Sequence, residues 1–325
     1  MKTKKDRIKI LVTGVGSELA LSILKALKIS FLDYYLVGTD IYPEVVGKYW
    51  CDKFYQVPLA KEEQNYLAEF KRIVLKENVA IIIPTVDREF SLLSKYKNEF
   101  SDSLNCHVLI NDSDEINRFN DKWSSYEWYV KHGIPTPKSF LINESKDLDD
   151  LAMDYPMIIK PREGGGSRSI FKINSFQDIE KYIEVVPTPL LQEYLFPDNE
   201  EYTAGTFRTL DNEIYTVILK RTLKFGMTNT AQIVLDNELN NFAKDVILKT
   251  NLIGSNNIQF RVTAEGPKVL EINPRFSGTT GIRAHFGFND VEMWINQALA
   301  KGKIQKPKIK EGFVLRYMEE QYHYK

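Results

Sequence analysis

The stretch Leu270-Glu271-Ile272-Asn273-Pro274-Arg275 alternates apolar and polar side chains and then ends in a proline and an arginine. On a strand, Glu271 and Asn273 lie two residues apart and therefore share one face. Their carboxylate and amide oxygens are hard ligands of the kind that Mg²⁺ prefers. The polar outer face of an edge hairpin would alternate in the same way. Because Arg275 and a glycine-containing segment follow directly, we expect a metal site here.

The preceding apolar strand carries a third oxygen donor. Gln259 lies between neighbours that face the other way, on a strand expected over 257–262. A turn at Gly266-Pro267 leads from there to the strand that holds Glu271. If the two strands pair, the oxygens of Gln259 and Glu271 converge. Arg275, just past the second strand, is placed to stabilise charge on a transferring phosphoryl group.

A lysine and a glycine loop precede these strands. Met157–Pro161 is predicted as a short buried strand containing Lys160, and the loop Gly164-Gly165-Gly166-Ser167 follows it. Glycines let backbone N–H groups approach phosphate oxygens, and an ammonium group neutralises their charge. No Gly-Lys-Ser/Thr triplet follows, which excludes a Walker A loop. One lysine at a strand end is usually solvated surface, so the prediction depends on the whole set.

The remaining patterns separate two regions. Apolar strands over 8–13, 35–39 and 79–83 alternate with amphipathic helices, which predicts one small, right-handed, doubly wound α/β domain over residues 1–111. After Asn111 the chain is predicted as α+β with mostly antiparallel strands. Its expected elements are a helix over 121–132, a strand over 190–195, a strand pair over 202–221 with its turn at Asp211-Asn212, and a helix over 238–250.

A glycine turn after the first strand has a second interpretation. Gly14 and Gly16 precede a helix and Asp40 ends the second strand, an arrangement that can hold a nicotinamide dinucleotide. The third glycine position is Leu19, so this fingerprint is incomplete. We favour a purely structural turn, and a nicotinamide-dependent oxidoreductase stays open as a rival.

Composition argues against several classes of protein. Lys and Arg number 43 against 44 Asp and Glu, a net charge of -1, which argues against a nucleic-acid binder with a large basic surface. Cys51 and Cys106 stand far apart without histidine neighbours, which disfavours a disulfide scaffold or zinc ribbon and favours the cytoplasm. No leader is evident, and no run approaches the roughly 18 apolar residues of a membrane span.

The order and spacing of these motifs resemble the ATP-grasp superfamily over essentially the whole chain. The resemblance is closest to the ATP-grasp domains of the carbamoyl phosphate synthetase large subunit, and more distant to biotin carboxylase and D-alanine–D-alanine ligase. It implies a Rossmann-like pre-ATP-grasp domain over 1–111 and an ATP-grasp domain over 112–325. The latter would comprise two α+β subdomains that clamp ATP, with the lid at about 123–190.

The resemblance also implies residue roles. Lys122 and Lys160 would contact the α- and β-phosphates, under a closing loop of Gly164, Gly165, Gly166 and Ser167. The ribose would be held by Glu201, although the adjacent Glu200 is an alternative. Arg275 would face the γ-phosphate. The adenine hinge would be Gln192, Glu193, Tyr194 and Leu195, and one or two Mg²⁺ ions (or Mn²⁺) would be bound by Gln259, Glu271 and Asn273.

The activity implied is that of an ATP-dependent carboxylate–amine ligase acting on two small molecules through an acyl phosphate. Arg283 is expected either to receive the substrate carboxylate or to form an internal salt bridge, and His285 and Arg316 are further candidates for that pocket. No second synthetase half is evident, so a free-standing carbamoyl phosphate synthetase is not expected. A catalytically silent nucleotide-binding protein is the other rival, and a homodimer is an open option.

Overall fold

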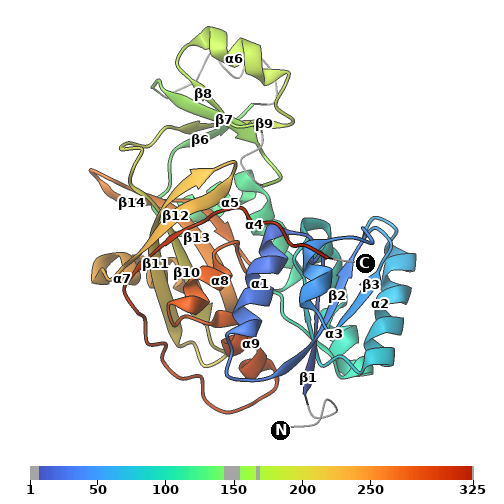
Figure 1. Ribbon diagram of the computed structural model, residues 1–325. Helices are drawn as coiled ribbons and strands as arrows, with labels where there is room; N and C mark the ends of the chain where they lie inside the picture. Colours follow the sequence, from blue (N-terminus) through green and yellow to red (C-terminus); the bar gives the residue numbers. More distant parts are fainter. Residues whose placement is uncertain (1–6, 143–153, 166–168, 324–325) are drawn as a thin grey trace.

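The computed structural model describes residues 7–142, 154–165 and 169–323. The N-terminal third forms a parallel sheet of five strands in the order β3-β2-β1-β4-β5 (Figure 1). Its strands are β1 (Ile8–Val12), β2 (Tyr34–Asp40), β3 (Lys53–Gln56), β4 (Ile81–Ile83) and β5 (His107–Val108). Its helices are α1 (Glu18–Lys28), α2 (Glu63–Glu77), α3 (Asp87–Leu104) and the short 3₁₀ helix η2 (Val46–Trp50).

Helices cover both faces of this sheet, which is why its central strands are apolar throughout. In β1, Ile10 and Val12 pack on the α1 side, while Leu11 packs on the side of α2 and α3. The predicted strands and helices of this region are confirmed to within a few residues. The edge strand β3 and the long helix α3 were not predicted.

The second half is built on an antiparallel sheet in the order β14-β13-β10-β11-β12-β15. Its strands are β10 (Glu201–Arg208), β11 (Ile214–Lys224), β12 (Met227–Val234), β13 (Gly254–Thr263), β14 (Gly266–Asn273) and β15 (Phe313–Leu315). One face packs against α4 (Ser113–Asn120), α5 (Lys122–Lys131) and α7 (Asn237–Leu248). The expected turn at Gly266-Pro267 is wrong by two residues, because both residues already belong to β14.

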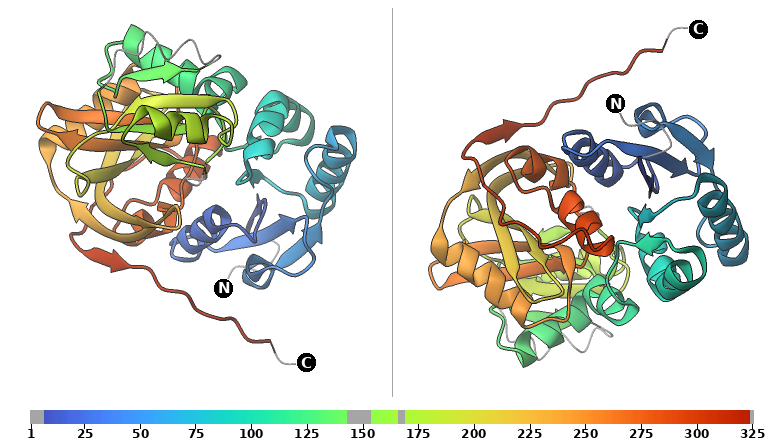
Figure 2. Two further views of the ribbon diagram at one scale, coloured as in Figure 1. Left: turned by 90° about the horizontal axis from the view of Figure 1, so that it is seen from above. Right: turned by 90° about the horizontal axis from the view of Figure 1, so that it is seen from below.

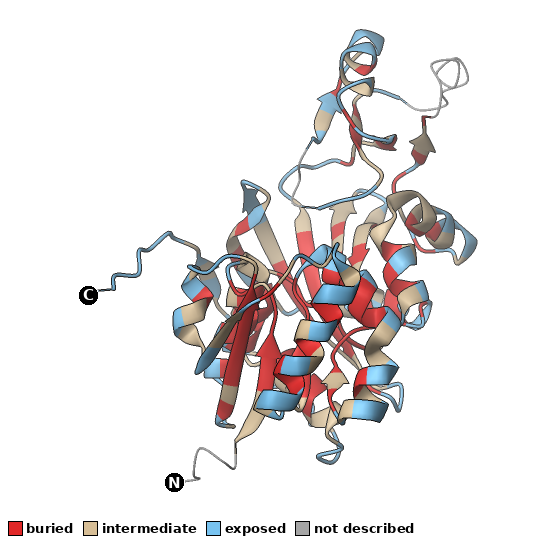
Figure 3. Ribbon diagram, turned by 90° about the vertical axis from the view of Figure 1, so that its right-hand side faces the viewer, coloured by how far each residue is buried: buried red, intermediate tan, exposed pale blue. Residues whose placement is uncertain are grey.

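The opposite face of the large sheet shares its core with the N-terminal domain. This core joins Phe207 and Val217 of the sheet to Ile23 and Leu27 of α1, and it includes Trp294. Helix α1 packs directly against α8 (Thr280–His285) and α9 (Asp290–Ala298). In Figure 3 the buried residues of the lower body gather on the strands and on the helices that face them.

A smaller antiparallel sheet stands above the large one, and Figure 2 shows from above that it overlies the large sheet. Its order is β6-β9-β7-β8, and it carries one helix on its outer side. Its core is separate and is formed by Met157, Ile159, Ile173, Ile179 and Leu191 with their neighbours. The elements are β6 (Ser139–Leu141), β7 (Met157–Pro161), β8 (Phe171–Ile173), β9 (Pro189–Glu193) and α6 (Phe176–Ile183).

Among the described residues, no helix is both long and apolar enough to span a bilayer.

Candidate active site

A cleft of about 2000 Å³ opens between the small sheet, the large sheet and the N-terminal domain. Most of the residues singled out from the sequence line it. They are Lys122, Lys160, Gly164, Gly165, Gln192, Glu193, Tyr194, Leu195, Glu201, Gln259, Glu271, Asn273 and Arg275. Arg283, His285 and Arg316 are not among its lining residues. The predicted loop residues Gly166 and Ser167 lie outside the described part of the chain.

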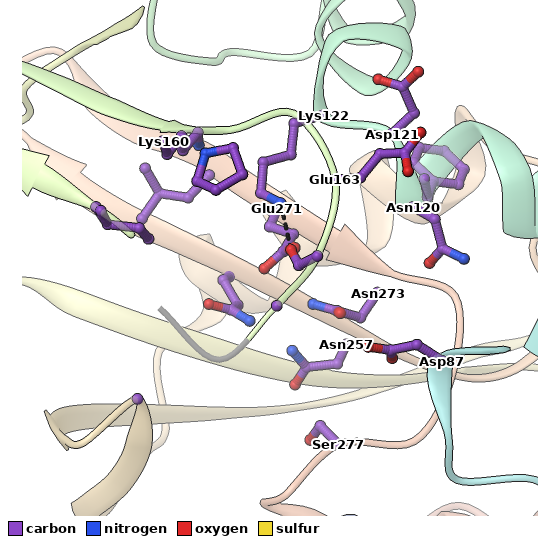
Figure 4. Close-up of a pocket in the computed structure, with 18 of the residues that line it drawn as sticks. Asp87, Asn120, Asp121, Lys122, Lys160, Glu163, Asn257, Glu271, Asn273 and Ser277 are labelled. Atoms are coloured by element: carbon purple, nitrogen blue, oxygen red, sulfur yellow. Dashed lines mark hydrogen bonds between the residues drawn. The ribbon is translucent and has the colours of Figure 1, made fainter. Parts of the chain in front are cut away.

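The three oxygen donors lie together on the floor of the cleft, because β13 and β14 pair as expected. Glu271 lies directly opposite Gln259 in the antiparallel register, and Asn273 lies opposite Asn257 (Figure 4). Within the described residues, no group donates a hydrogen bond to the Glu271 carboxylate or to the Asn273 amide oxygen. Two free oxygen donors beside a third amide oxygen suit a hard divalent cation such as Mg²⁺.

This donor set contains a single carboxylate. No group of three or more His, Cys, Asp or Glu that could hold a metal is present in the described ranges. The set is therefore less negatively charged than an all-carboxylate site, and the bulk of the charge that attracts a cation would come from a phosphate ligand. The residues fit a metal that is bound together with a nucleotide.

Lys160 enters the cleft from the small sheet and is nearly buried, with 8% of its surface exposed. Its Nζ donates a hydrogen bond of 2.8 Å to Gln192 Oε1 on β9, and Gln192 Nε2 donates one of 2.9 Å to Ser139 Oγ. Burial lowers the pKa of Lys160 to about 8, an effect that Lys122 reinforces and Glu271 opposes. The side chain of Gln192, predicted as part of the adenine hinge, thus supports Lys160.

Lys122 is the first residue of α5, where Asp121 caps the helix by accepting hydrogen bonds from two backbone N–H groups. The same Asp121 forms a salt bridge with Arg162, so the start of α5 is tied to the strand that carries Lys160. Lys122 Nζ donates to the carbonyl of Gly164 across 2.6 Å. In Figure 4 the side chains of Lys122 and Lys160 both lie on the small-sheet side of the cleft, facing Glu271.

The hinge segment, residues 192–195, borders the cleft. The Glu193 carboxylate is engaged elsewhere, because it accepts from the Lys138 N–H at 3.0 Å and lies 3.4 Å from Lys268 Nζ. Tyr194 and Leu195 line the cleft directly after β9 ends. A planar ligand at this point would therefore lie against Tyr194 and Leu195.

Two arginines that the sequence analysis missed hold Glu201. Arg221 donates to Glu201 Oε1 at 3.0 Å and to Gln259 Oε1 at 2.8 Å, both through Nη2. Arg261 Nη2 donates to Glu201 Oε2 at 3.1 Å, and its Nη1 donates to the Leu195 carbonyl at 2.8 Å. The neighbouring Glu200 does not line the cleft and instead binds Lys220 and the Tyr202 hydroxyl. Of these two neighbours, Glu201 lines the cleft and Glu200 does not.

Arg275 lines the cleft where the large sheet meets the N-terminal domain. Its Nη2 lies 3.8 Å from Asp87 Oδ1, at the start of α3, and its guanidinium lies over the Phe90 ring. Glu18, at the start of α1, also lines this side, where it is paired with Arg316. Positive and negative side chains thus lie together where the N-terminal domain borders the cleft.

Arg283 does not face the cleft, which corrects the expectation that it receives a substrate carboxylate. Its side chain is fully buried and forms a salt bridge with Asp290, the second alternative raised by the sequence. It also donates to Ser255 Oγ at 3.0 Å and to Ser277 Oγ at 3.3 Å. Gly205 makes room for it, since a Cβ there would lie 2.6 Å from Arg283 Cδ.

The glycine turn of the N-terminal domain has a structural role. The Gly16 N–H donates to the buried Asp40 carboxylate at 2.8 Å, which uses both groups that a dinucleotide would need. A Cβ on Gly16 would lie 2.8 Å from Val45 Cγ1. These contacts favour the structural interpretation of the turn.

Comparison with known proteins gives two family matches. A family described as "ATP-grasp domain" matches residues 119–279, and one described as "PylC-like, N-terminal domain" matches residues 10–109. An uncharacterized protein of Methanocaldococcus jannaschii is 27% identical over 310 residues, which cover 90% of this chain and 72% of that protein. A carbamoyl-phosphate synthase of Methanobrevibacter smithii is 24% identical over 127 residues, 38% of this chain. The match spans only 35% of that synthase.

The solved structures share the fold. N5-carboxyaminoimidazole synthetase from Staphylococcus aureus superposes with a TM-score of 0.73 at 17% identity, covering 95% of this chain and 82% of that one. At this identity the likeness concerns the fold alone, and it extends over both matched regions.

Proposed function

The chain is an ATP-grasp protein with a PylC-like N-terminal domain, and from this premise we propose that it is an ATP-dependent carboxylate–amine ligase. A carboxylate substrate attacks the γ-phosphate of ATP and forms an acyl phosphate and ADP. An amine then displaces phosphate to give the amide. The observation that carries the proposal is that Lys122 and Lys160 face Glu271 across one cleft (Figure 4).

Different residues of the cleft would bind the phosphates, the adenine and the ribose of the nucleotide. Lys122 and Lys160 neutralise the phosphates from the small-sheet side, and Tyr194 and Leu195 offer main-chain groups to the adenine. Glu201 Oε1 accepts two hydrogen bonds from Arg221, whereas Oε2 accepts one from Arg261 and retains a lone pair for a ribose hydroxyl. Each contact is charge neutralisation or alignment, which is what phosphoryl transfer asks of a protein.

Gln259, Glu271 and Asn273 would hold the divalent cation, which when bound neutralises the phosphate oxygens and polarises the γ-phosphate. Arg275 stands beside them on the side of the N-terminal domain. We place the substrate carboxylate and the acyl phosphate there, because a guanidinium fork fits both groups. The reaction needs no side-chain nucleophile. The proposed activity is akin to that of a carbamoyl phosphate synthetase domain, with its own acid and amine.

The first test is calorimetric titration with a non-hydrolysable ATP analogue, with and without Mg²⁺, and with NADH in parallel. We expect Mg²⁺-dependent binding of the analogue that Lys160→Ala abolishes. Lys181→Ala, an exposed lysine of α6 outside the cleft, is the matched control and should bind normally. Carboxylates are then screened for ADP release with hydroxylamine as the trapping amine. A folded sample that binds no nucleotide would overturn the ligase proposal.

A further inference from the structure

Arg221 and Arg261 form a continuous chain of hydrogen bonds with Glu201 along one side of the cleft. The chain runs from Gln259 Oε1 through Arg221 to one oxygen of Glu201, and from the other oxygen through Arg261 to the Leu195 carbonyl. Arg221 is nearly buried, with 8% of its side chain exposed. The Arg221 guanidinium therefore already binds the side-chain oxygen of Gln259, one of the three residues assigned to the metal.

Charged groups of both signs line the cleft around this point. The carboxylates of Glu201 and Glu271 line the cleft, together with the guanidinium groups of Arg221, Arg261 and Arg275 and the ammonium groups of Lys122 and Lys160. Further carboxylates line the same cleft, among them Asp87, Glu163 and Glu193. Glu201 itself, next to Gln259, is one carboxylate between two guanidinium groups. A free divalent cation that binds Gln259 Oε1 meets the Arg221 guanidinium, which lies at hydrogen-bond distance from the same oxygen. Within a half-buried cleft the repulsion between these two cations is weakly screened.

Building on the proposed ligase function, we propose that Arg221 is an internal competitor of the metal, which makes divalent-cation binding depend on the nucleotide. Without nucleotide, its guanidinium holds Gln259 Oε1 and excludes the ion. The phosphates of ATP supply the negative charge that lets both cations remain in the cleft. Arg221 thus sets the order of binding, so that the metal enters with the nucleotide and not before it.

A competitor and a structural support predict opposite effects of losing Arg221 on the affinity for the metal. If Arg221 merely held Gln259 in place for the metal, its loss would weaken metal binding under all conditions. A competitor has the opposite effect, because its loss strengthens binding of the metal alone. The affinity for the metal with and without nucleotide also defines a coupling between the two ligands. Loss of the competitor reduces that coupling.

The experiment titrates Mn²⁺ into the protein and counts free Mn²⁺ by its electron paramagnetic resonance signal, first alone and then with saturating ADP. We expect the wild type to bind Mn²⁺ alone weakly and with ADP tightly. Arg221→Met should bind Mn²⁺ alone about tenfold more tightly, with a smaller effect of ADP. Arg221→Lys keeps the positive charge and should remain close to the wild type.

Lys220→Met is the matched control. Lys220 is the neighbouring cation on β11, paired with Glu200 outside the cleft, and its removal changes the net charge equally. Unchanged or weaker binding of Mn²⁺ alone by a folded Arg221→Met variant overturns the proposal, as does an equal gain in Lys220→Met. If the wild type binds no Mn²⁺ even with ADP, the ligase proposal fails. In that case, tighter binding of Mn²⁺ alone by the Arg221→Met variant would still show that Arg221 competes with the metal.

Discussion

Lys160 and Gln192 lie on neighbouring strands of the small sheet, and the Lys160 ammonium donates a hydrogen bond to the Gln192 side chain across 2.8 Å. Gln192 is neutral, so it satisfies a proton of the ammonium without compensating its charge. Burial consequently lowers the pKa of Lys160 to about 8. This residue should report on pH in a range that experiments reach easily.

We expect the affinity for an ATP analogue to fall as pH rises above about 8. In the free protein Lys160 loses its proton there, while a bound phosphate favours the charged form, so binding must take up a proton. One such group weakens affinity by at most about tenfold per pH unit. The Lys160→Arg variant stays charged over the whole pH range, so its affinity for the analogue should fall less above pH 8. Identical slopes in the two proteins, measured by calorimetry from pH 7 to 9.5, would contradict the assignment.

Glu271→Gln should reduce ATP turnover by about a hundredfold or more, because it removes the single carboxylate among the three oxygen donors. Glu265→Gln, an exposed carboxylate at the tip of the same hairpin, is the control and should turn over normally. ADP release by both variants is the measurement. Full turnover by Glu271→Gln would show that the metal role is wrongly assigned.

Arg283→Met should destabilise the protein by about 3–5 kcal/mol, because it leaves Asp290 charged and unpaired in the core. Urea denaturation of the folded protein measures the loss. Arg283→Met combined with Asp290→Asn should recover part of it, since no isolated charge then stays buried. A single variant as stable as the wild type would mean that Asp290 finds other compensation.

Glu89 offers a second test by pH, this time of stability. Its buried carboxyl group accepts hydrogen bonds from the Thr13 and Tyr66 hydroxyls, and burial raises its pKa to about 7. The folded state therefore binds this proton more tightly than the unfolded state does. Its contribution to the free energy of unfolding is fully present below about pH 4.5 and is lost as pH rises to about 7.

Glu89→Gln imitates the protonated carboxyl at every pH and should show a shallower decline in stability between pH 5 and 7. Urea midpoints at several pH values provide the comparison with the wild type. Parallel curves for the two proteins would exclude Glu89 as the titrating group. Tyr66→Phe, which keeps the carboxyl but removes one donor, should retain a decline with pH.

The parts of the fold that could be predicted from the sequence are those that the order of apolar and polar residues within a short segment determines. The apolar run of β1 and the alternation of β14 identified their strands, and the pairing of Gln259 with Glu271 follows from one short hairpin. Helix α3 was not predicted although it has 18 residues, because charged residues interrupt its apolar face.

The rest of the site depends on register and on distant packing. A turn centred on Asp211-Asn212 would pair Arg221 with residue 202, whereas the observed register pairs Lys220 with Tyr202 and brings Arg221 to Glu201. This shift by one residue reverses the face of every side chain on a strand. Arg283 is buried because Gly205 leaves space and Asp290 supplies charge, and neither follows from the segment around residue 283.

The apolar face of α1 is covered by α8 and α9 as well as by its own sheet. Its buried residues also share a core with Phe207 and Val217 of the large sheet, so the N-terminal domain and the large sheet are not separate modules joined by a tether. Exchanging either half for that of a relative would demand matched changes on the opposing helices, so the halves are expected to diverge in concert. The small sheet has a core of its own, so substitutions inside it are not tied to α1 in this way.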